Sequence, residues 1–256
     1  MAKYSVAQRR NRTLKLLQEK GLVSVSELGK ELEVTEVTIR KDLEYLEDHN
    51  LLIRTHGGAM HNGYLVYDQS IEEKGRKYAE EKRAIGRAAA KLVANGDTIL
   101  MDAGTTVMQV ARGLRGKHNL TVLTTAINVA LELIKHPDVE VLMIGGTVRL
   151  ISAAVVGPNA EQMVREHSCR KLFLAVNGFD LDHGITTTNT LEAQLKRVMI
   201  DSAQETIVVT DSSKFSQRGL SRICKVEDVD IVITDKNISD NFKKQLEDRG
   251  IRVIIA

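Results

Sequence analysis

The stretch TILMDAGTTV, residues 98–107, joins a short apolar run to an aspartate, a glycine and two threonines. An apolar, β-branched run bounded by a glycine turn is typical of a buried strand. The residues that follow Thr105 and Thr106 are predicted to form a helix. A strand that leads through a glycine into the start of a helix is a common way to build a phosphate site. This stretch therefore predicts both an α/β fold and a site for an anion.

The same strand, loop and helix pattern recurs through the rest of the chain. Most of the apolar runs are almost continuous, which is typical of strands that are covered on both faces. Helical segments between the runs imply right-handed crossovers and a mostly parallel sheet, and thus a doubly wound α/β domain. Ligands bind such sheets outside the carboxyl ends of the strands. Seven runs are predicted to be strands: 98–101, 120–124, 139–144, 172–176, 206–210, 231–234 and 252–255.

The chain is long enough for two domains, one of ordinary size and one small. It has 256 residues, of which 43% are hydrophobic and 27% are charged, as in an average globular protein. The formal net charge of +2 is nearly neutral, so overall electrostatics neither require nor exclude nucleic acid. We predict a small amino-terminal domain over residues 1–60, a linker over 61–75 and a larger α/β domain over 76–256.

Several function classes are disfavoured by composition. Cys169 and Cys224 lie far apart without metal-type spacing, so we expect free thiols in a reducing compartment. His56 and His61 share a glycine-rich turn that offers no third ligand, so we expect no metal site and no cofactor. No stretch approaches the roughly 18 consecutive apolar residues of a membrane span. We therefore expect a cytoplasmic protein that does not contact the membrane.

The first 60 residues are predicted to form three helices, of which the first covers about residues 6–20. Ser24 with Glu27 three residues later forms a capping box that begins the second helix. Thr35 is placed to cap a third helix, EVTIRKDLEYLED, over residues 36–48. The apolar positions of this third helix form a single buried stripe, made of Ile39, Leu43 and Leu46.

This arrangement predicts a helix-turn-helix, in which the first residues of the third helix reach the edges of DNA bases. The segment LLIRTHGGAM, residues 51–60, predicts a strand, a glycine turn and a returning strand, which would form a wing against the phosphates. The alternative is an ordinary three-helix module that binds protein, since residues 1–62 carry ten Lys or Arg against nine Asp or Glu. The predicted DNA contacts are Thr35, Val37, Thr38, Arg40, Lys41, Arg54 and His56.

Residues 34–59, VTEVTIRKDLEYLEDHNLLIRTHGGA, closely resemble the amino-terminal signature of the DeoR family of bacterial regulators of sugar metabolism. Thr35 stands where the family commonly has serine, and Lys41 where it commonly has arginine, so Lys41 loses bidentate pairing with a guanine. The resemblance continues through Lys82 and in IGRAAAKL at 85–92, DAGTT at 102–106, LTTAIN at 123–128, GGTVR at 145–149 and TDSSKF at 210–215.

The resemblance implies an α/β protein in which a winged helix-turn-helix repressor domain is joined to a mostly parallel-sheet sensor domain similar to ribose-5-phosphate isomerase. It also implies that a phosphorylated sugar binds the sensor domain, weakens the affinity for the DNA operator and turns transcription on. Because helix-turn-helix proteins usually bind paired half-sites, we expect a homo-oligomer.

The predicted effector site lies at the strand ends of the sensor domain. Backbone N–H groups near Thr105 would bind a phosphate, and Gly104 would allow close approach. Asp102 either accepts hydrogen bonds from sugar hydroxyls or caps the following turn, and Lys214 either pairs with the phosphate or lies on the surface. No nucleotide-binding motif is present. The predicted effector-binding residues are Asp102, Gly104, Thr105, Thr106, Thr124, Asn128, Gly145, Gly146, Asn177 and Lys214.

An enzymatic function is the main alternative to a sensor. Glu192 and Lys196 are spaced as an ordinary surface pair of a helix. Together with Asp102 and Lys214 they could supply the acid and base of a sugar-phosphate isomerase, although their spacing does not show that they meet. A DNA-reading domain on the same chain favours sensing, so we expect no catalysis. A protein scaffold without DNA affinity is a third possibility.

Overall fold

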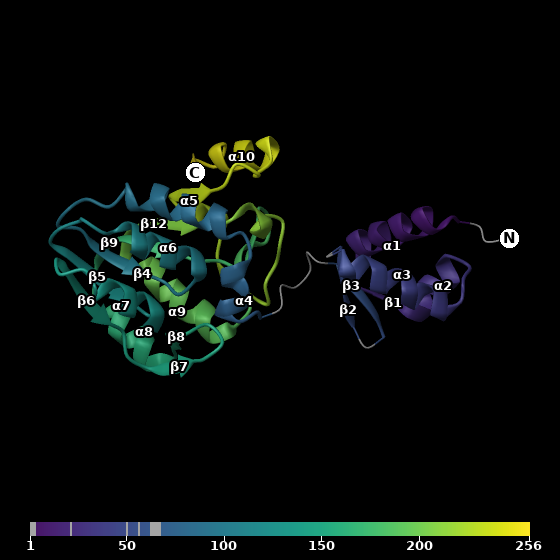
Figure 1. Cartoon of the computed structure of the whole chain (residues 1–256), viewed down its shortest axis with the longest axis horizontal. Coiled ribbons are helices and arrows are strands. Elements are labelled where there is room, and N and C mark those ends of the chain that lie inside the picture. The colour runs from purple at the N-terminus through teal and green to yellow at the C-terminus, as the bar shows by residue number, and fades with distance from the viewer. Residues whose placement is uncertain (1–3, 21, 50, 56, 62–67) are drawn as a thin grey trace. The chain divides into compact units, whose positions relative to one another are not determined.

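The computed structural model describes residues 4–20, 22–49, 51–55, 57–61 and 68–256. The chain divides into two compact units, Met1–Val66 and Tyr67–Ala256 (Figure 1). The division falls within the linker predicted over residues 61–75. The carboxyl-terminal part of that range forms a short helix, α4 (Ile71–Arg76), which belongs to the larger unit.

The described residues of the smaller unit form three helices and a three-stranded antiparallel sheet of order β1-β3-β2. This is a winged helix-turn-helix, as predicted. The strand β1 was not predicted, because three residues are too few to show a pattern. The elements are α1 (Val6–Lys20), β1 (Leu22–Ser24), α2 (Val25–Glu31), α3 (Glu36–Asp48), β2 (Leu52–Thr55) and β3 (Gly58–His61).

The two predicted caps begin their helices. The Ser24 hydroxyl accepts the Glu27 N–H at 3.1 Å, and the Thr35 hydroxyl accepts the Thr38 N–H at 3.4 Å. Each bond satisfies a backbone donor that the first turn of a helix leaves without a partner. The stripe predicted on α3 is buried in the core of the unit with residues of α1 and α2: Leu17, Leu28, Leu32, Ile39, Leu43 and Leu46.

A buried ion pair fixes α3 against α1. The carboxylate of Asp42 accepts hydrogen bonds from Arg9 Nη2 at 3.2 Å and from Arg10 Nε at 3.1 Å. The Arg10 guanidinium also lies 3.5 Å from the ring centroid of Tyr45, within the range of a cation–π contact. Arg9 and Asp42 are both buried, so their charges are compensated inside the unit and the orientation of α3 is set from behind.

The larger unit is built on a seven-stranded sheet of order β15-β14-β12-β9-β4-β5-β6, in which every neighbouring pair is parallel. All seven predicted strands are present, so the prediction of a parallel α/β sheet is confirmed. The strands are β4 (Thr98–Met101), β5 (Leu120–Thr124), β6 (Val139–Met143), β9 (Cys169–Leu174), β12 (Ala203–Val209), β14 (Ile231–Thr234) and β15 (Arg252–Ile255).

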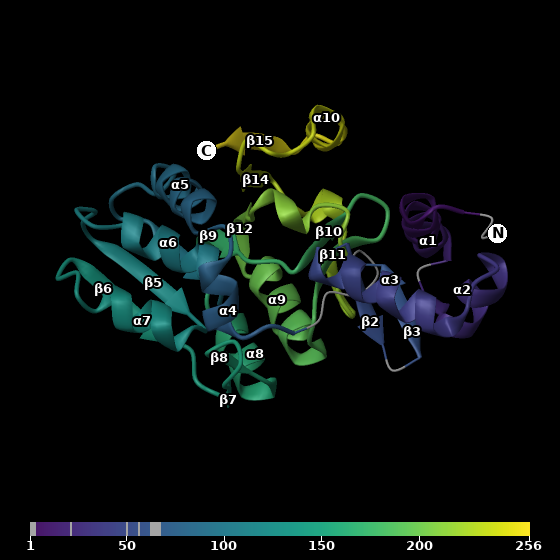
Figure 2. The ribbon, with the colours of Figure 1, turned by 45° about the vertical axis from the view of Figure 1, so that its right-hand side comes forward.

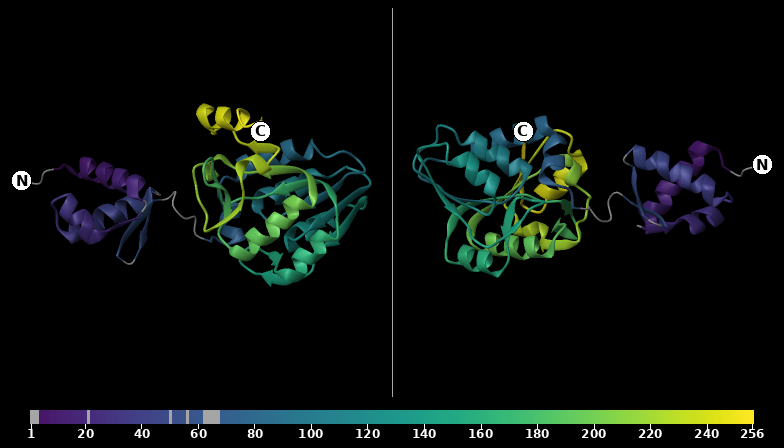
Figure 3. Two further views of the ribbon diagram at one scale, coloured as in Figure 1. Left: turned by 180° about the vertical axis from the view of Figure 1, so that it is seen from behind. Right: turned by 60° about the horizontal axis from the view of Figure 1, so that its bottom comes forward.

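Helices cover both faces of this sheet (Figures 2 and 3). Side chains of β4 alternate between two cores: Ile99 and Met101 pack with α5, α6 and α7, and Leu100 packs with α8 and α9. This alternation explains the continuous apolar run of the strand. The helices are α5 (Ala79–Ala90), α6 (Thr105–Gly113), α7 (Ile127–Leu133), α8 (Pro158–Arg165), α9 (Thr190–Asp201) and α10 (Asp240–Glu247).

The remaining elements are short. β7 (Thr147–Arg149) pairs with β8 (Ala154–Val156), and β10 (Gly178–Asp180) and β13 (Ser221–Cys224) flank β11 (Gly184–Thr187) in a small antiparallel sheet. Two 3₁₀ helices are η1 (Ser212–Lys214) and η2 (Val226–Asp228). No helix in the described ranges combines the length and the apolar character needed to cross a membrane.

The strand order reverses beside β4. From β4 the chain adds β5 and β6 on one side of the sheet, and then adds β9, β12, β14 and β15 on the other side. The carboxyl ends of β4 and β9 are therefore neighbours, but the connections that leave them run to different parts of the sheet. Such a switch point is where open α/β sheets bind ligands.

Candidate functional site

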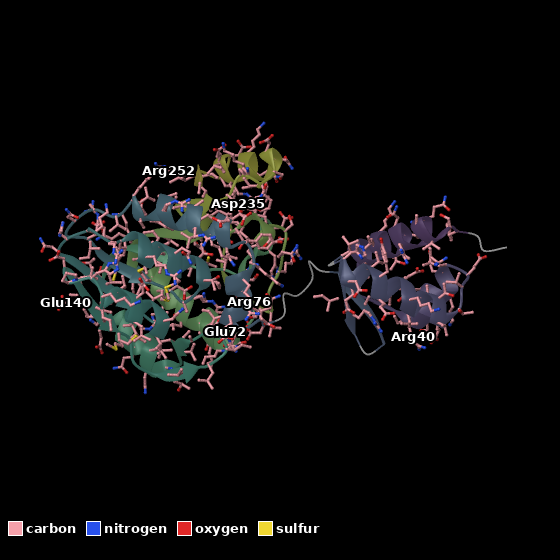
Figure 4. All side chains as sticks on the ribbon, viewed as in Figure 1. Arg40, Glu72, Arg76, Glu140, Asp235 and Arg252 are labelled. Atoms are coloured by element: carbon pink, nitrogen blue, oxygen red, sulfur yellow. The ribbon has the colours of Figure 1, made fainter. Side chains whose placement is uncertain are left out.

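The exposed face of α3 carries the residues predicted to read DNA. The side chain of Val37 is 61% exposed, and Lys41 and Arg40, of which Arg40 is labelled in Figure 4, are exposed as well. Arg40 Nη2 donates to Glu36 Oε2 at 2.9 Å, and the Thr35 and Thr38 hydroxyls lie 3.0 Å apart. The side chains of Val37, Arg40 and Lys41 are thus exposed to a partner, and the bond to Glu36 holds Arg40 along the surface of the helix.

The wing is the hairpin of β2 and β3. Thr55 at the end of β2 pairs with Gly58 at the start of β3. Arg54 on β2 is exposed, its guanidinium lies 3.8 Å from Glu47 Oε2, and its backbone N–H donates to Glu47 Oε1 at 3.1 Å. A Cβ atom on Gly58 would lie 2.0 Å from the Val23 carbonyl oxygen, so only glycine allows β1 to pair there. His56, the other residue predicted for the wing, lies outside the described residues.

A pocket in the larger unit lies at the topological switch point. It encloses about 840 Å³, counted out to its open mouth, and residues after four neighbouring strands line it. β4 contributes Asp102–Thr106, β5 contributes Thr125, β9 contributes residues 175–177, and β12 contributes residues 210, 211 and 214. Residues from α4, α5, α9 and the β7–β8 hairpin complete the wall. The ends of β4, β5, β9 and β12 therefore meet at one pocket, whereas the predicted strand end at Gly145 and Gly146 does not line it.

The amino-terminal end of α6 opens into this pocket. Gly104 is the N-cap and supplies no side-chain cap, so the first N–H groups of the helix are left for another acceptor. A Cβ atom on Gly104 would lie 2.7 Å from Ala175 Cβ, so the close approach of the two strand ends requires a glycine. With Thr105 and Thr106 in the lining, this end of α6 has the donors and the helix dipole that favour an anion.

Asp102 and Lys196 form a buried ion pair at the base of the pocket. Their exposures are 3% and 5%, and the Lys196 ammonium donates to Asp102 Oδ2 and, at 2.8 Å, to the Ala175 carbonyl oxygen. The Ala175 N–H donates to the same carboxylate at 3.0 Å. Burial raises the pKa of the Asp102 carboxyl, and the Lys196 ammonium opposes this shift. Asp102 therefore ties α9 to the ends of β4 and β9.

The prediction that Glu192 and Lys196 form an ordinary surface pair is wrong. Both side chains are buried, because α9 turns this face toward the pocket, and each has its closest partners elsewhere. Glu192 accepts from Arg149 Nη1 at 2.8 Å and from the Thr187 hydroxyl at 3.1 Å. Burial disfavours the Glu192 carboxylate, but Lys196 and Arg149 outweigh it and hold the pKa of Glu192 below its usual range.

The pocket has an excess of positive charge. Five lysines and three carboxylates line it, which leaves a formal charge of +2. The lysines are Lys74, Lys77, Lys82, Lys196 and Lys214, and the acids are Asp102, Glu192 and Asp211. Ammonium groups that share a pocket repel one another, so a bound anion would relieve this repulsion.

Lys82 shows the effect of this crowding. Its ammonium donates to the Lys74 and Lys77 carbonyl oxygens at 2.6 and 2.7 Å, where it closes the end of α4, and it lies 4.0 Å from Asp211 Oδ2. Burial lowers the pKa of Lys82 to about 8, with neighbouring lysines adding to the shift and Asp211 opposing it. Burial also lowers the pKa of Lys74.

The buried hydroxyl of Thr125 has no hydrogen-bond partner among the described residues. Thr125 is fully buried (0% exposed), lines the pocket, and makes no hydrogen bond through Oγ1 within the described part of the chain. A buried polar group without a partner costs roughly 1–3 kcal/mol, so such groups usually meet water or a ligand. Thr125 is therefore a candidate ligand contact that the effector-site prediction did not include.

Six of the ten predicted effector residues line the pocket: Asp102, Gly104, Thr105, Thr106, Asn177 and Lys214. The structure does not bring the other four to it. The Thr124 hydroxyl donates to the Met101 carbonyl oxygen at 2.8 Å and accepts the Ala126 N–H at 3.1 Å, inside the core.

Asn128, Gly145 and Gly146 also lie outside the pocket lining, for different local reasons. Asn128 lines an adjoining cavity between α4 and α6, which shares Ile71, Lys82 and Thr105 with the pocket. Gly145 is exposed, and its N–H faces the Met163 sulfur at 3.3 Å. A Cβ atom on Gly146 would lie 2.8 Å from Val155 Cγ1, so this glycine permits packing against β8.

The residues that sequence reasoning missed are mainly the lysines before β4. Lys74 and Lys77 lie on and just after α4, in a segment predicted to be partly linker, and their spacing carries no motif. Lys82 was noted only as part of the family resemblance. No group of three or more His, Cys, Asp or Glu side chains in the described residues could hold a metal ion, and Cys169 and Cys224 are free thiols.

Comparison with known proteins agrees with this architecture. Residues 9–63 match the DeoR-like helix-turn-helix domain, and residues 77–236 match the DeoR C terminal sensor domain. A putative aga operon transcriptional repressor from Escherichia coli O157:H7 is 35% identical over 252 residues, covering 98% of this chain and 94% of that protein. A lactose phosphotransferase system repressor from Staphylococcus epidermidis is 32% identical over 244 residues, covering 94% and 95%.

Among solved structures, ribose 5 phosphate isomerase A from Neisseria gonorrhoeae aligns with a TM-score of 0.39 and 13% identity, over 54% of this chain and 53% of that chain. The two relatives by sequence are named as repressors, in agreement with the prediction of a regulator that is not an enzyme. The family matches together span both units. The chain belongs to the DeoR family of helix-turn-helix transcriptional regulators.

Proposed function

We propose that this regulator represses a sugar-utilisation operon and is released from its operator when a phosphorylated sugar binds the pocket of the larger unit. The observation that carries the proposal is the convergence of five lysines with the open amino-terminal end of α6 at the switch point of the sheet. An anionic ligand is the partner that this combination of ammonium groups and free N–H donors would stabilise.

The charge of the pocket sets the charge of the ligand. A phosphate monoester carries close to two negative charges near neutral pH, which would balance the formal excess of two lysines. In our proposal, the phosphate lies at the start of α6, where it accepts hydrogen bonds from the N–H groups and hydroxyls of Thr105 and Thr106. Lys214, which lines the pocket without a described ion pair, would supply a charge-assisted bond.

The remaining polar groups would hold the sugar body. Thr125 Oγ1 is free to donate to a ring or hydroxyl oxygen, and Asn177 and Glu192 line the same wall. Asp102 is already engaged by Lys196 and by the Ala175 N–H, so we assign it the role of orienting Lys196 rather than that of a primary sugar contact. Since hydroxyl positions differ among sugars, this wall would decide which sugar phosphate is accepted.

The smaller unit would read the operator with α3 in the major groove. Arg40 and Lys41 would contact base edges or nearby phosphates, Val37 would make an apolar contact, and Arg54 would place the wing against the backbone. Paired half-sites would require a homo-oligomer, in which two copies of α3 face successive turns of the duplex. A protein with these partners would act in the cytoplasm.

Release of the operator requires that the sugar phosphate bind the DNA-competent and DNA-free states unequally. A coupling of about 1–3 kcal/mol, which changes the operator affinity by roughly 5- to 150-fold, is typical of such systems. A ligand that binds both states equally would leave transcription unchanged, however tightly it binds.

A binding screen tests the proposal. The protein is titrated in a thermal-shift assay with hexose and amino-sugar phosphates, with the parent sugars and with inorganic phosphate, and hits are confirmed by calorimetry. We expect at least one sugar phosphate to bind about tenfold or more tightly than its parent sugar, and Lys214→Gln to remove most of this difference. Equal affinity for a sugar and its phosphate would contradict the proposal.

A further inference from the structure

The guanidinium of Arg149 holds two carboxylates at once. Arg149 is the last residue of β7, and its Nη1 atom donates to Glu192 Oε1 at 2.8 Å, while Nη2 donates to Asp68 Oδ2. Glu192 lines the pocket. Asp68 lies two residues before Ser70, the N-cap of α4, and it opens the described part of the larger unit. One side chain therefore joins the pocket wall to the chain segment that follows the DNA-binding unit.

Asp68 is shared among several donors. It also accepts the Thr188 hydroxyl at 2.9 Å, and its carboxylate lies 3.8 Å from the Lys74 ammonium. Burial opposes ionisation of Asp68, but its hydrogen bonds with Arg149 and Thr188 outweigh this and hold its pKa below the usual range. Lys74 itself lines the pocket. The carboxylate of Asp68 thus depends on two cations that also face the ligand site or its wall.

The helix that follows Asp68 is fixed at both ends by residues of the pocket region. At its start, the Ile71 N–H donates to the Ile151 carbonyl oxygen, in the turn after Arg149, at 2.8 Å. At its end, the Lys82 ammonium donates hydrogen bonds to the Lys74 and Lys77 carbonyl oxygens. Residues 68–77 are therefore part of the pocket wall as well as the start of the larger unit.

The charges in this network balance before an anion enters. Arg149 and Lys74 face Asp68 and Glu192, which gives two positive groups for two negative ones. An anion in the pocket would attract Lys74 away from Asp68 and would repel the carboxylate of Glu192. Arg149 forms one salt bridge with Asp68 and one with Glu192. The anion would therefore alter the surroundings of both partners of Arg149.

We infer that Arg149 is the positioning residue through which an anion in the pocket changes the hold on residues 68–77, and thereby the affinity of the protein for DNA. The inference rests on the proposed effector pocket and adds the route of its regulation. Arg149 lies outside the pocket lining, so its role is to hold Asp68 and Glu192 in place rather than to bind the effector.

The test compares binding with coupling in the full chain. Duplexes selected from a random-sequence library serve as the DNA probe, and inorganic phosphate, followed by the tightest binder of the sugar-phosphate panel, serves as the ligand. Arg149→Lys keeps a positive charge but has one ammonium in place of a two-armed guanidinium. Arg218→Met is the control for loss of an arginine elsewhere in the larger unit, because Arg218 pairs with Asp180 and does not line the pocket.

We expect Arg149→Lys to bind the ligand within about threefold of wild type, while the ligand-induced loss of DNA affinity shrinks by about fivefold or more, a typical coupling change. Arg218→Met should keep the full response. Amide hydrogen exchange at residues 71–77 should respond to ligand in wild type and in Arg218→Met, but much less in Arg149→Lys. Asp68→Asn should uncouple the response in the same way, and it provides the test if the Arg149 variant does not fold.

Several outcomes would overturn the inference. It fails if both Arg149→Lys and Asp68→Asn keep the wild-type loss of DNA affinity, or if the Arg218 control loses it equally. Failure of the wild type itself to bind any sugar phosphate would be a different result, since it would refute the proposed effector pocket and not the role of Arg149 alone.

Discussion

The ammonium of Lys196 lies against the carboxylate of Asp102, although the two residues are 94 positions apart. The backbone of Ala175 completes the arrangement, because its N–H donates to Asp102 and its carbonyl oxygen accepts from Lys196. A strand end, a helix and the end of the neighbouring strand are thereby joined below the pocket. Since both side chains are buried, each charge depends on the other for its stability.

Removing one partner of this pair should destabilise the larger unit. Asp102→Asn leaves a buried ammonium without a counter-charge, so we expect a loss of about 3–5 kcal/mol in the free energy of unfolding, measured with urea. The double variant Asp102→Asn with Lys196→Met should recover most of this loss, because neither charge of the pair remains. Additive losses would show that the two groups do not interact.

The pH dependence of Lys196→Met provides a second check on the pair. Burial already raises the pKa of Asp102, and loss of the ammonium removes the main opposing cause. The native state would then hold a proton that the unfolded state releases, so stability should fall as pH rises above the ordinary carboxyl pKa of about 3.9. We expect the penalty of Lys196→Met to be larger at about pH 8 than at about pH 5. A penalty independent of pH would contradict this assignment.

Thr125 and Thr124 form a matched pair of neighbouring buried threonines. Thr125→Val removes a hydroxyl that has no hydrogen-bond partner in the described part of the chain, so we expect the unliganded protein to be unchanged or more stable by up to about 1–3 kcal/mol. The same variant should bind the sugar phosphate more weakly. Thr124→Val breaks two hydrogen bonds inside the core and should lower stability by a similar amount, without a direct effect on the ligand. Urea unfolding and calorimetry measure both quantities.

The sequence predicted the fold well because its signals are local. A continuous apolar run identifies a strand covered on both faces, and the caps Ser24 and Thr35 mark helix starts with side chains that act within three residues. The strands β7 and β10 were missed because three residues show no period. The helix α4 was missed because none of its residues is buried, so it shows no apolar stripe.

The candidate site was predicted only in part because its partners are distant in sequence. The glycine-containing strand end at Gly104 is recognisable from residues next to it, and it lies in the pocket. The ion pair of Asp102 with Lys196 depends on the packing of α9 against β9, which no spacing in the sequence reveals. The strand end at Thr124 was correctly located, but the pleat turns its hydroxyl into the core and leaves Thr125 to face the pocket.

Deprotonation of Lys82 should weaken ligand binding at high pH. Its pKa is lowered to about 8 by burial and by Lys214, Lys74 and Lys77, against the opposing effect of Asp211. As pH rises through about 8, Lys82 loses its charge, so affinity for a phosphate dianion should fall. The native state itself should gain stability between that value and the unfolded pKa of about 10.4, because it binds fewer protons than the unfolded state there.

Calorimetry in two buffers measures this effect directly. A bound anion favours the protonated ammonium, so binding near pH 8 should take up protons, and the observed heat should depend on the ionisation enthalpy of the buffer. This dependence should disappear in Lys82→Met and persist in Lys91→Met, in which an exposed lysine of the same region is replaced. Proton uptake that survives in Lys82→Met would assign the titration to another group.

Variants of Arg40 and Thr35 should distinguish the role of α3 in DNA binding from its contribution to stability. The Arg40 guanidinium pairs on the surface with Glu36 alone among the described residues, so Arg40→Ala should change stability by less than about 0.5 kcal/mol. The same change should weaken binding to a selected duplex by about 1–3 kcal/mol and relax the sequence preference. Thr35→Ala removes the cap of α3 and should cost about 1 kcal/mol of stability. If Arg40→Ala bound the duplex as tightly as wild type, α3 would not be the reading helix.

Val37 should recognise the methyl group of a thymine. It is an apolar side chain, 61% exposed, on the same face of α3 as Arg40 and Lys41. The thymine methyl is the apolar group that a base pair presents in the major groove, and it is the natural contact of a side chain that cannot form a hydrogen bond. Replacing that thymine by uracil removes one methyl group, so the wild-type affinity should fall about fourfold, the value of one buried carbon. Val37→Ala should bind more weakly overall and lose most of its sensitivity to the replacement, whereas uracil at other positions should affect both proteins equally. A wild-type protein that tolerates uracil at every thymine of the half-site would show that Val37 faces solvent in the complex.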